Sequence, residues 1–92
     1  KTQFLTLICC FACTWAAYGQ KTWLGSSNDN WHTAANWSPS GAPNNTHDVV
    51  IGSATNQPRI FQNNAVCRNI TFNSGGTLLI SAGRTLSVFG TT

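Results

Sequence analysis

Charged side chains are scarce in this sequence, and acidic ones are the scarcest. Charged residues make up 8% of the chain, against about a quarter in an ordinary soluble domain. The only carboxylates are Asp29 and Asp48, and the five basic residues are spread singly along the chain. This pattern offers no basic patch for nucleic acid or a membrane. Hydrophobic residues at 41% argue against disorder, and a polarity supplied by Asn, Ser, Thr, Gln and Gly is typical of extracellular β-proteins.

The shortage of charged residues also leaves few side chains that could take part in catalysis. Glycosidases use paired carboxylates, but Asp29 and Asp48 have the sequence settings of turn and strand-entrance residues. His32, His47 and Cys67 match no zinc spacing, and the clustered oxygen ligands of a calcium site are missing. There is no Gly-x-Ser-x-Gly elbow and no phosphate-binding loop. We therefore predict a protein that is not an enzyme, with no catalytic residue, metal site or cofactor.

Residues 1–19 have the features of a secretory signal peptide. Lys1 precedes an almost uninterrupted apolar run from Phe4 to Ala17, and Ala17-Tyr18-Gly19 offers small residues for cleavage before Gln20. The alternative is a transmembrane helix, but the run is shorter than the roughly 20 residues that a crossing needs. We predict a cleaved signal helix and a secreted or cell-surface protein.

Cleavage would also remove three of the four cysteines. Cys9, Cys10 and Cys13 lie in the signal segment, so only Cys67 stays in the mature chain. One cysteine excludes an internal disulfide framework. In its strand-like setting, Cys67 is expected to be a small buried hydrophobe.

Residues 20–64 form an irregular entry segment rich in Trp and Asn. We expect one or two helical turns within residues 31–37, a turn cluster over residues 38–45, a strand over His47–Ile51, and a weaker strand at Arg59–Phe61.

Residues 65–92 contain short strands that repeat every eight residues. Ile70, Leu78 and Leu86 form one series, and a second apolar residue follows each of them after one intervening position. Such alternation buries one face of a strand, and glycines occupy the turns. We expect the repeats to continue beyond the chain end.

Two all-β architectures fit this repeat. In an antiparallel meander or sandwich fragment, successive strands are hairpin neighbours. In a right-handed parallel β-helix, they form the sides of one coil, and coils stack on each other. The turns lack the Asn-Gly or Asp-Gly pairs that two-residue hairpins prefer, which favours the β-helix, with its N-terminal cap and first coils in this chain.

A family resemblance rests on four short motifs. They are Trp23-Leu24-Gly25, Asp29-Asn30-Trp31, residues 34–38 (Ala-Ala-Asn-Trp-Ser) and Asp48-Val49-Val50-Ile51. Together with the Thr-Leu rungs that follow, they resemble the N-terminal segments of large secreted parallel β-helix and adhesin-like repeat proteins of Bacteroidetes. The resemblance implies the start of a longer surface protein without enzymatic activity.

The function we expect is therefore that of a non-catalytic, adhesive structural segment of a bacterial surface protein. Its partners would be downstream β-helix coils of the same protein, and polysaccharide or cell-surface glycan. The alternatives are a carbohydrate-binding β-module and the non-catalytic start of a polysaccharide-degrading β-helix enzyme. Trp23, Trp31 and Trp37 are the candidate glycan-contact residues, because indole rings stack on sugars. They would instead cap the first coil if their rings are buried.

Overall fold

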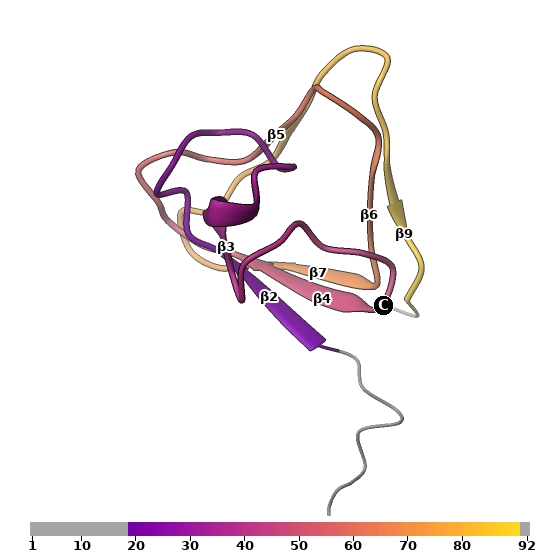
Figure 1. Ribbon diagram of the computed structural model, residues 1–92, viewed down its shortest axis with the longest axis horizontal. Helices are drawn as coiled ribbons and strands as arrows, with labels where there is room; N and C mark the ends of the chain where they lie inside the picture. The colour runs from indigo at the N-terminus through magenta and orange to yellow at the C-terminus, as the bar shows by residue number, and fades with distance from the viewer. Residues whose placement is uncertain (1–18, 91–92) are drawn as a thin grey trace, which may run out of the picture.

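The computed structural model describes residues 19–90, so the predicted signal peptide lies outside the described residues apart from Gly19. Eight short strands and one 3-10 turn make up the described part (Figure 1). In chain order these are β2 (Gly19–Trp23), η2 (Ala34–Asn36), β3 (Trp37–Ser38), β4 (His47–Ile51), β5 (Arg59–Ile60), β6 (Ala65–Cys67), β7 (Asn69–Phe72), β8 (Leu79–Ile80) and β9 (Leu86–Val88). The described chain is therefore all-β. The strands expected at residues 47–51 and 59–61 are confirmed, and the helical segment is a single turn.

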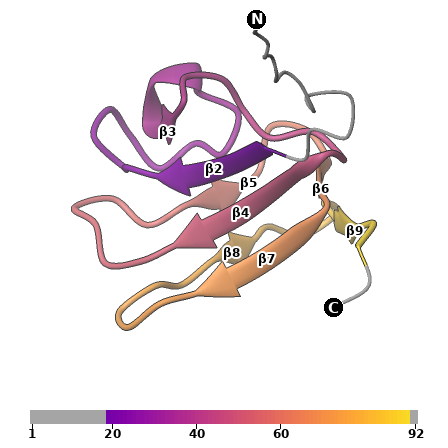
Figure 2. The same cartoon turned by 90° about the horizontal axis from the view of Figure 1, so that it is seen from below.

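The strands form three small sheets. The largest has the order β3-β2-β4-β7, and the other two are the pairs β5-β8 and β6-β9. All pairings are parallel except that of β2 with the two-residue strand β3. Figure 2 shows β2, β4 and β7 side by side, with their arrowheads pointing the same way.

Two segments of the chain follow the same path, one beside the other. The first runs through β4, β5 and β6, and the second through β7, β8 and β9. Each strand of the second segment pairs in parallel with its counterpart in the first, as Ile70 does with Val49 and Leu86 with Ala65. Strands β8 and β9 lie in different sheets and do not pair with each other. The antiparallel meander therefore does not describe these strands.

The core lies between the three sheets. Val49, Ile51, Ile60, Ala65 and Cys67 are buried there. They come from β4, β5 and β6, and along β4 and β6 they alternate with more exposed residues, as expected for strands with one buried face. The first segment thus supplies most of the core that is not tryptophan.

The repeated arrangement extends further back than the sequence pattern suggested. The eight-residue spacing joins the three sides of one segment, but the third corner, between β6 and β7, contains only Arg68. Paired residues are therefore 21 positions apart in β4-β7 and β6-β9, as between Val49 and Ile70, and 20 positions apart in β5-β8, as between Ile60 and Ile80. The half-buried, polar Gln57 lies eight residues from both Val49 and Ala65. Because Gln57 interrupts the apolar residues at this spacing, the eight-residue series cannot be recognised in the earlier segment from the sequence.

Candidate functional site

Trp23, Trp31 and Trp37 pack together at the β2 end of the core. The Trp37 ring lies edge-on to both neighbours, with centroid distances of 5.1 Å to Trp23 and 4.9 Å to Trp31. All three side chains are at most 4% exposed. Trp37 Nε1 donates to Trp31 O, and Trp23 Nε1 donates to Asn56 O, each at 2.7 Å. The indoles therefore form a closed apolar cluster, which we call the tryptophan cap.

The buried amide of Asn36 shapes the loop that carries the tryptophan cap. Its Oδ1 accepts from the backbone N–H groups of Ser27 and Asn28, at 2.9 and 3.1 Å. Its Nδ2 donates to Asn28 Oδ1 and to Asn30 O, at 2.8 and 3.0 Å. An amide has both donors and an acceptor, so one side chain pairs with both donors and acceptors of residues 27–30. Asn36 thereby ties the residues that precede Trp31 to the residue that precedes Trp37.

Lys21 and β3 close this end of the structure. Lys21 lies opposite Val49 and is buried, and its Nζ donates to Pro39 O and Ser40 O at 2.9 and 3.1 Å. Strand β3 pairs with the outer edge of β2 at Thr22 and Trp23. An inward charge and a covered edge both discourage further strand pairing. The β2 end is therefore closed.

The burial of the tryptophan rings bears on the two roles considered for them. Sugar stacking needs an exposed ring face, whereas the faces of Trp23, Trp31 and Trp37 are enclosed by protein. This burial favours the capping role. A glycan contact at these residues stays a prediction that would require the cap to open.

The opposite end of the structure is open. Strand β7 is the outermost strand of its sheet, and β8 and β9 each have one paired edge (Figure 2). Phe72, Ile80 and Val88 lie opposite the buried residues Ile51, Ile60 and Cys67, yet they are 48%, 42% and 43% exposed. We call the surface formed by Phe72, Ile80, Val88 and the outer edges of residues 70–72, β8 and β9 the open face.

Both carboxylates are engaged by arginines. Asp48 accepts from Arg68 Nη1 at 2.7 and 2.9 Å and from Asn69 Nδ2 at 3.2 Å. Asp29 Oδ2 lies 3.4 Å from Arg59 Nε, a distance that suits an ion pair, although the geometry is not that of a hydrogen bond. Each carboxylate thus holds its own turn or corner, in keeping with the structural roles expected from the sequence.

The remaining reactive side chains are also held in structural settings. Cys67 is buried, and burial first and Asp48 second raise the pKa of its thiol, which keeps it in the unreactive neutral form. Burial first and Lys21 second lower the pKa of His47, whose Nδ1 accepts from Asn44 N–H at 2.9 Å. The His32 ring Nε2 lies 3.1 Å from Asn63 O.

Residues 19–90 contain no pocket and no group of three or more His, Cys, Asp or Glu side chains placed to share a metal ion. None of the helical segments in this part of the chain has the length and apolarity to span a membrane.

The open face is the feature that sequence reasoning did not identify as a site. Alternation predicted that Ile80 and Val88 point inward, but it gave no sign that they lie at the edge of the core. One signal was present: Arg84 is the only charged residue between Asn69 and Gly90. Edge strands usually carry protective charges, so their near absence marks this stretch as unusual.

The chain belongs to the DUF8693 family, a domain of unknown function whose model matches residues 22–91. The matched range includes the tryptophan cap and all strands from β3 to β9. Comparison with curated proteins gave no match, and neither did comparison with solved structures.

Proposed function

We propose that this DUF8693 domain is a non-catalytic structural segment of an exported, surface-associated bacterial protein: the N-terminal cap and first coils of a right-handed parallel β-helix. In this assignment the segments β4-β5-β6 and β7-β8-β9 are two successive coils. The role is to start and anchor a repeat array with an adhesive surface. Trp23, Trp31 and Trp37 act as the cap and not as a binding platform.

The observation that carries this proposal is the parallel register of all three strand pairs. Asp48–Ile51 pairs with Asn69–Phe72, Arg59–Ile60 with Leu79–Ile80, and Ala65–Cys67 with Leu86–Val88. Stacked coils of a β-helix require this arrangement, because each coil buries its apolar face only against its neighbours. Buried residues of the first segment lie opposite apolar residues of the second, and the β2 end is closed. Both features support the β-helix assignment.

Export is supported by the N-terminal sequence, in which Lys1 precedes an apolar run that ends in Ala17-Tyr18-Gly19. The test is expression of the chain with an added initiator Met in a bacterium, followed by fractionation and N-terminal sequencing. We expect protein outside the cytoplasm that begins at Gln20. Membrane-embedded protein that retains Lys1 would contradict the export proposal.

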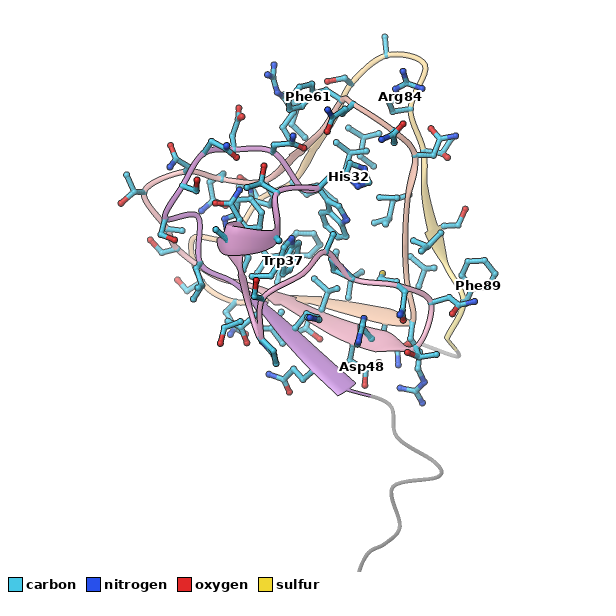
Figure 3. The ribbon with its side chains drawn as sticks, in the orientation of Figure 1. His32, Trp37, Asp48, Phe61, Arg84 and Phe89 are labelled. Atoms are coloured by element: carbon cyan, nitrogen blue, oxygen red, sulfur yellow. The ribbon has the colours of Figure 1, made fainter. Side chains whose placement is uncertain are left out.

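A carbohydrate-binding module is the second candidate, and one exposed aromatic corner favours it. Phe61 is partly exposed, the Arg59 guanidinium lies 4.2 Å from its ring centroid, and Arg84 Nε donates to Phe61 O at 3.1 Å. Figure 3 shows Phe61 and Arg84 at this corner, away from Trp37. An aromatic ring beside guanidinium groups suits an acidic sugar.

Retention on immobilised acidic and neutral polysaccharides tests this second candidate. Specific retention that Phe61→Ala abolishes, without loss of stability, would support a carbohydrate-binding module. Equal retention of the two proteins, or none, would leave the structural role as the better account of the corner.

A further inference from the structure

The open face has the properties of an unfinished core. Phe72 lies opposite the inward residue Ile51, and Ile80 and Val88 lie opposite the inward residues Ile60 and Cys67. These inward residues of the first segment are fully buried, because the second segment covers them. Phe72, Ile80 and Val88 have the same orientation without that cover. Apolar side chains so arranged gain free energy when another layer removes them from water.

The strand edges at the open face are also unprotected. Exposed edges are usually blunted by Lys, Pro, bulges or a covering loop. Residues 69–90 contain no Lys, Pro, Asp or Glu, and their one charged side chain, Arg84, lies in the turn between β8 and β9. The closed end of the same molecule has both an inward lysine, Lys21, and the covering strand β3. The open face is therefore fit for strand addition, whereas the edge of β2 is not.

The backbone leaving β9 leads onto this face. Phe89 N donates to Cys67 O at 3.0 Å, and Gly90 N donates to Arg68 O, so the β6-β9 pairing continues around the corner. One segment earlier, Arg68 N donates to His47 O at 2.7 Å immediately before β7 pairs with β4. A side chain at Gly90 would collide with Asn69 Oδ1 and Arg68 O. Glycine thus permits the close approach that carries the chain toward the outer edge of residues 70–72.

We propose that the open face is a docking surface for one further coil of parallel strands, supplied by the same polypeptide. This rests on the proposed β-helix function and extends it by naming the partner and its chemistry. The docking coil pairs in register with β7, β8 and β9, and it places apolar residues over Phe72, Ile80 and Val88. The path of residues 89–90 selects a coil of the same chain. Head-to-tail stacking of separate copies is blocked by Lys21 and β3 at the closed end.

An extended chain tests this inference directly. A second copy of residues 70–90 is appended after Gly90 of the full chain, which preserves the 21-residue register of Val49 with Ile70. We expect the denaturation midpoint to rise. We also expect hydrogen exchange of the amides of residues 70–72 to slow by about tenfold or more, since paired edges open less often. An unchanged midpoint with unchanged exchange would overturn the proposal.

Ile80→Asn provides the matched control, made at the original position in both chains. In the unextended chain it removes a half-exposed side chain and should hardly move the midpoint. In the extended chain it should abolish most of the gain. An equal effect in both chains would contradict docking, and so would a dimer of the unextended chain that Ile80→Asn dissociates, because that result assigns the face to a second copy.

Failure of this inference can be distinguished from failure of the proposed function. The stacked arrangement of the existing coils is tested separately by linking Cys67 to position 88 through Val88→Cys, and export is tested by N-terminal sequencing. If the link forms and the chain is exported while the extension has no effect, only the docking proposal is wrong. If the link does not form, the β-helix assignment itself is wrong.

Discussion

Cys67 and Val88 lie directly opposite each other on the parallel strands β6 and β9, yet Cys67 is fully buried and Val88 is 43% exposed. Both side chains are on the inward face of their strands. Neighbouring strands are about 4.8 Å apart, which is within the Cα separation of about 4.4–6.8 Å that a disulfide spans. The difference in burial therefore reflects position in the stack, since β9 has a partner on one side only.

This pairing predicts that Val88→Cys forms a disulfide with Cys67. Because the Cys67 thiol is buried and unreactive in the folded protein, the variant chain from Gln20 onward is refolded under oxidising conditions, and we expect both free thiols to disappear and the mass to fall by two hydrogens. Ser87→Cys is the matched control, because Ser87 lies opposite Val66, one residue away from Cys67, and should keep a free thiol. A free thiol at position 88 after oxidation would contradict the parallel register.

Ile60 and Ile80 form a second matched pair, with the same side chain in two layers. They are register partners in β5 and β8, and Ile60 is completely buried. Ile60→Ala should lower the free energy of unfolding by about 2–4 kcal/mol, as buried aliphatic truncations do. Ile80→Ala should cost less than about 1 kcal/mol, because its side chain is already half in water. Chemical denaturation of both variants measures the difference, and equal losses would mean that Ile80 is covered in solution.

Trp37→Ala tests the role of the tryptophan cap. Its ring packs against both other tryptophans, so its loss should cost about 3–5 kcal/mol of stability. Leu24→Ala is the control at an exposed apolar residue and should change stability by about 0.5 kcal/mol or less. A stable Trp37→Ala variant that loses affinity for a polysaccharide would support glycan binding and contradict capping.

The sequence predicted strand content and the inward alternation well, because both are local properties of the chain. The strand His47–Ile51 and the inward positions of Ile80 and Val88 follow from a period of two along a strand. The layer in which each residue lies could not be predicted. Ile60 and Ile80 are identical in type, and only the pairing of distant strands decides which one is covered.

The tryptophan cap was harder to predict for a related reason. Trp23, Trp31 and Trp37 are amphipathic, so their presence fits both a sugar platform and a buried cluster. The choice depends on the Asn36 network, which joins residues up to nine positions apart across a loop without regular structure. No periodic pattern marks such contacts. The Asn-rich composition was the only visible signal.

Asn36→Ala should be among the most damaging single polar substitutions in the loop. It leaves the part-buried N–H groups of Ser27 and Asn28 without their acceptor, and a donor whose partner water does not replace costs about 1–3 kcal/mol. Asn28→Ala removes the acceptor of two bonds, from Asn36 Nδ2 and from Asn30 N–H, but Asn28 is exposed, so water can replace it and the substitution should cost less. Comparable losses for the two variants, measured by thermal denaturation, would show that the Asn36 amide is not the organising group.

His47 predicts how stability responds to acid. Its pKa is lowered in the folded protein by burial and by Lys21, so the unfolded chain, with a pKa of about 6.5, binds the proton more readily. The stability contributed by neutral His47 is therefore complete above about pH 6.5 and is lost as the pH falls toward the lower folded-state pKa. Protonation also removes the Nδ1 acceptor for Asn44 N–H. We expect His47→Gln to weaken the loss of stability as the pH falls below about 6.5, with wild type and variant showing parallel curves above about pH 7.5. Denaturation midpoints across this range provide the measurement, and an unchanged acid dependence in the variant would assign the effect to other groups.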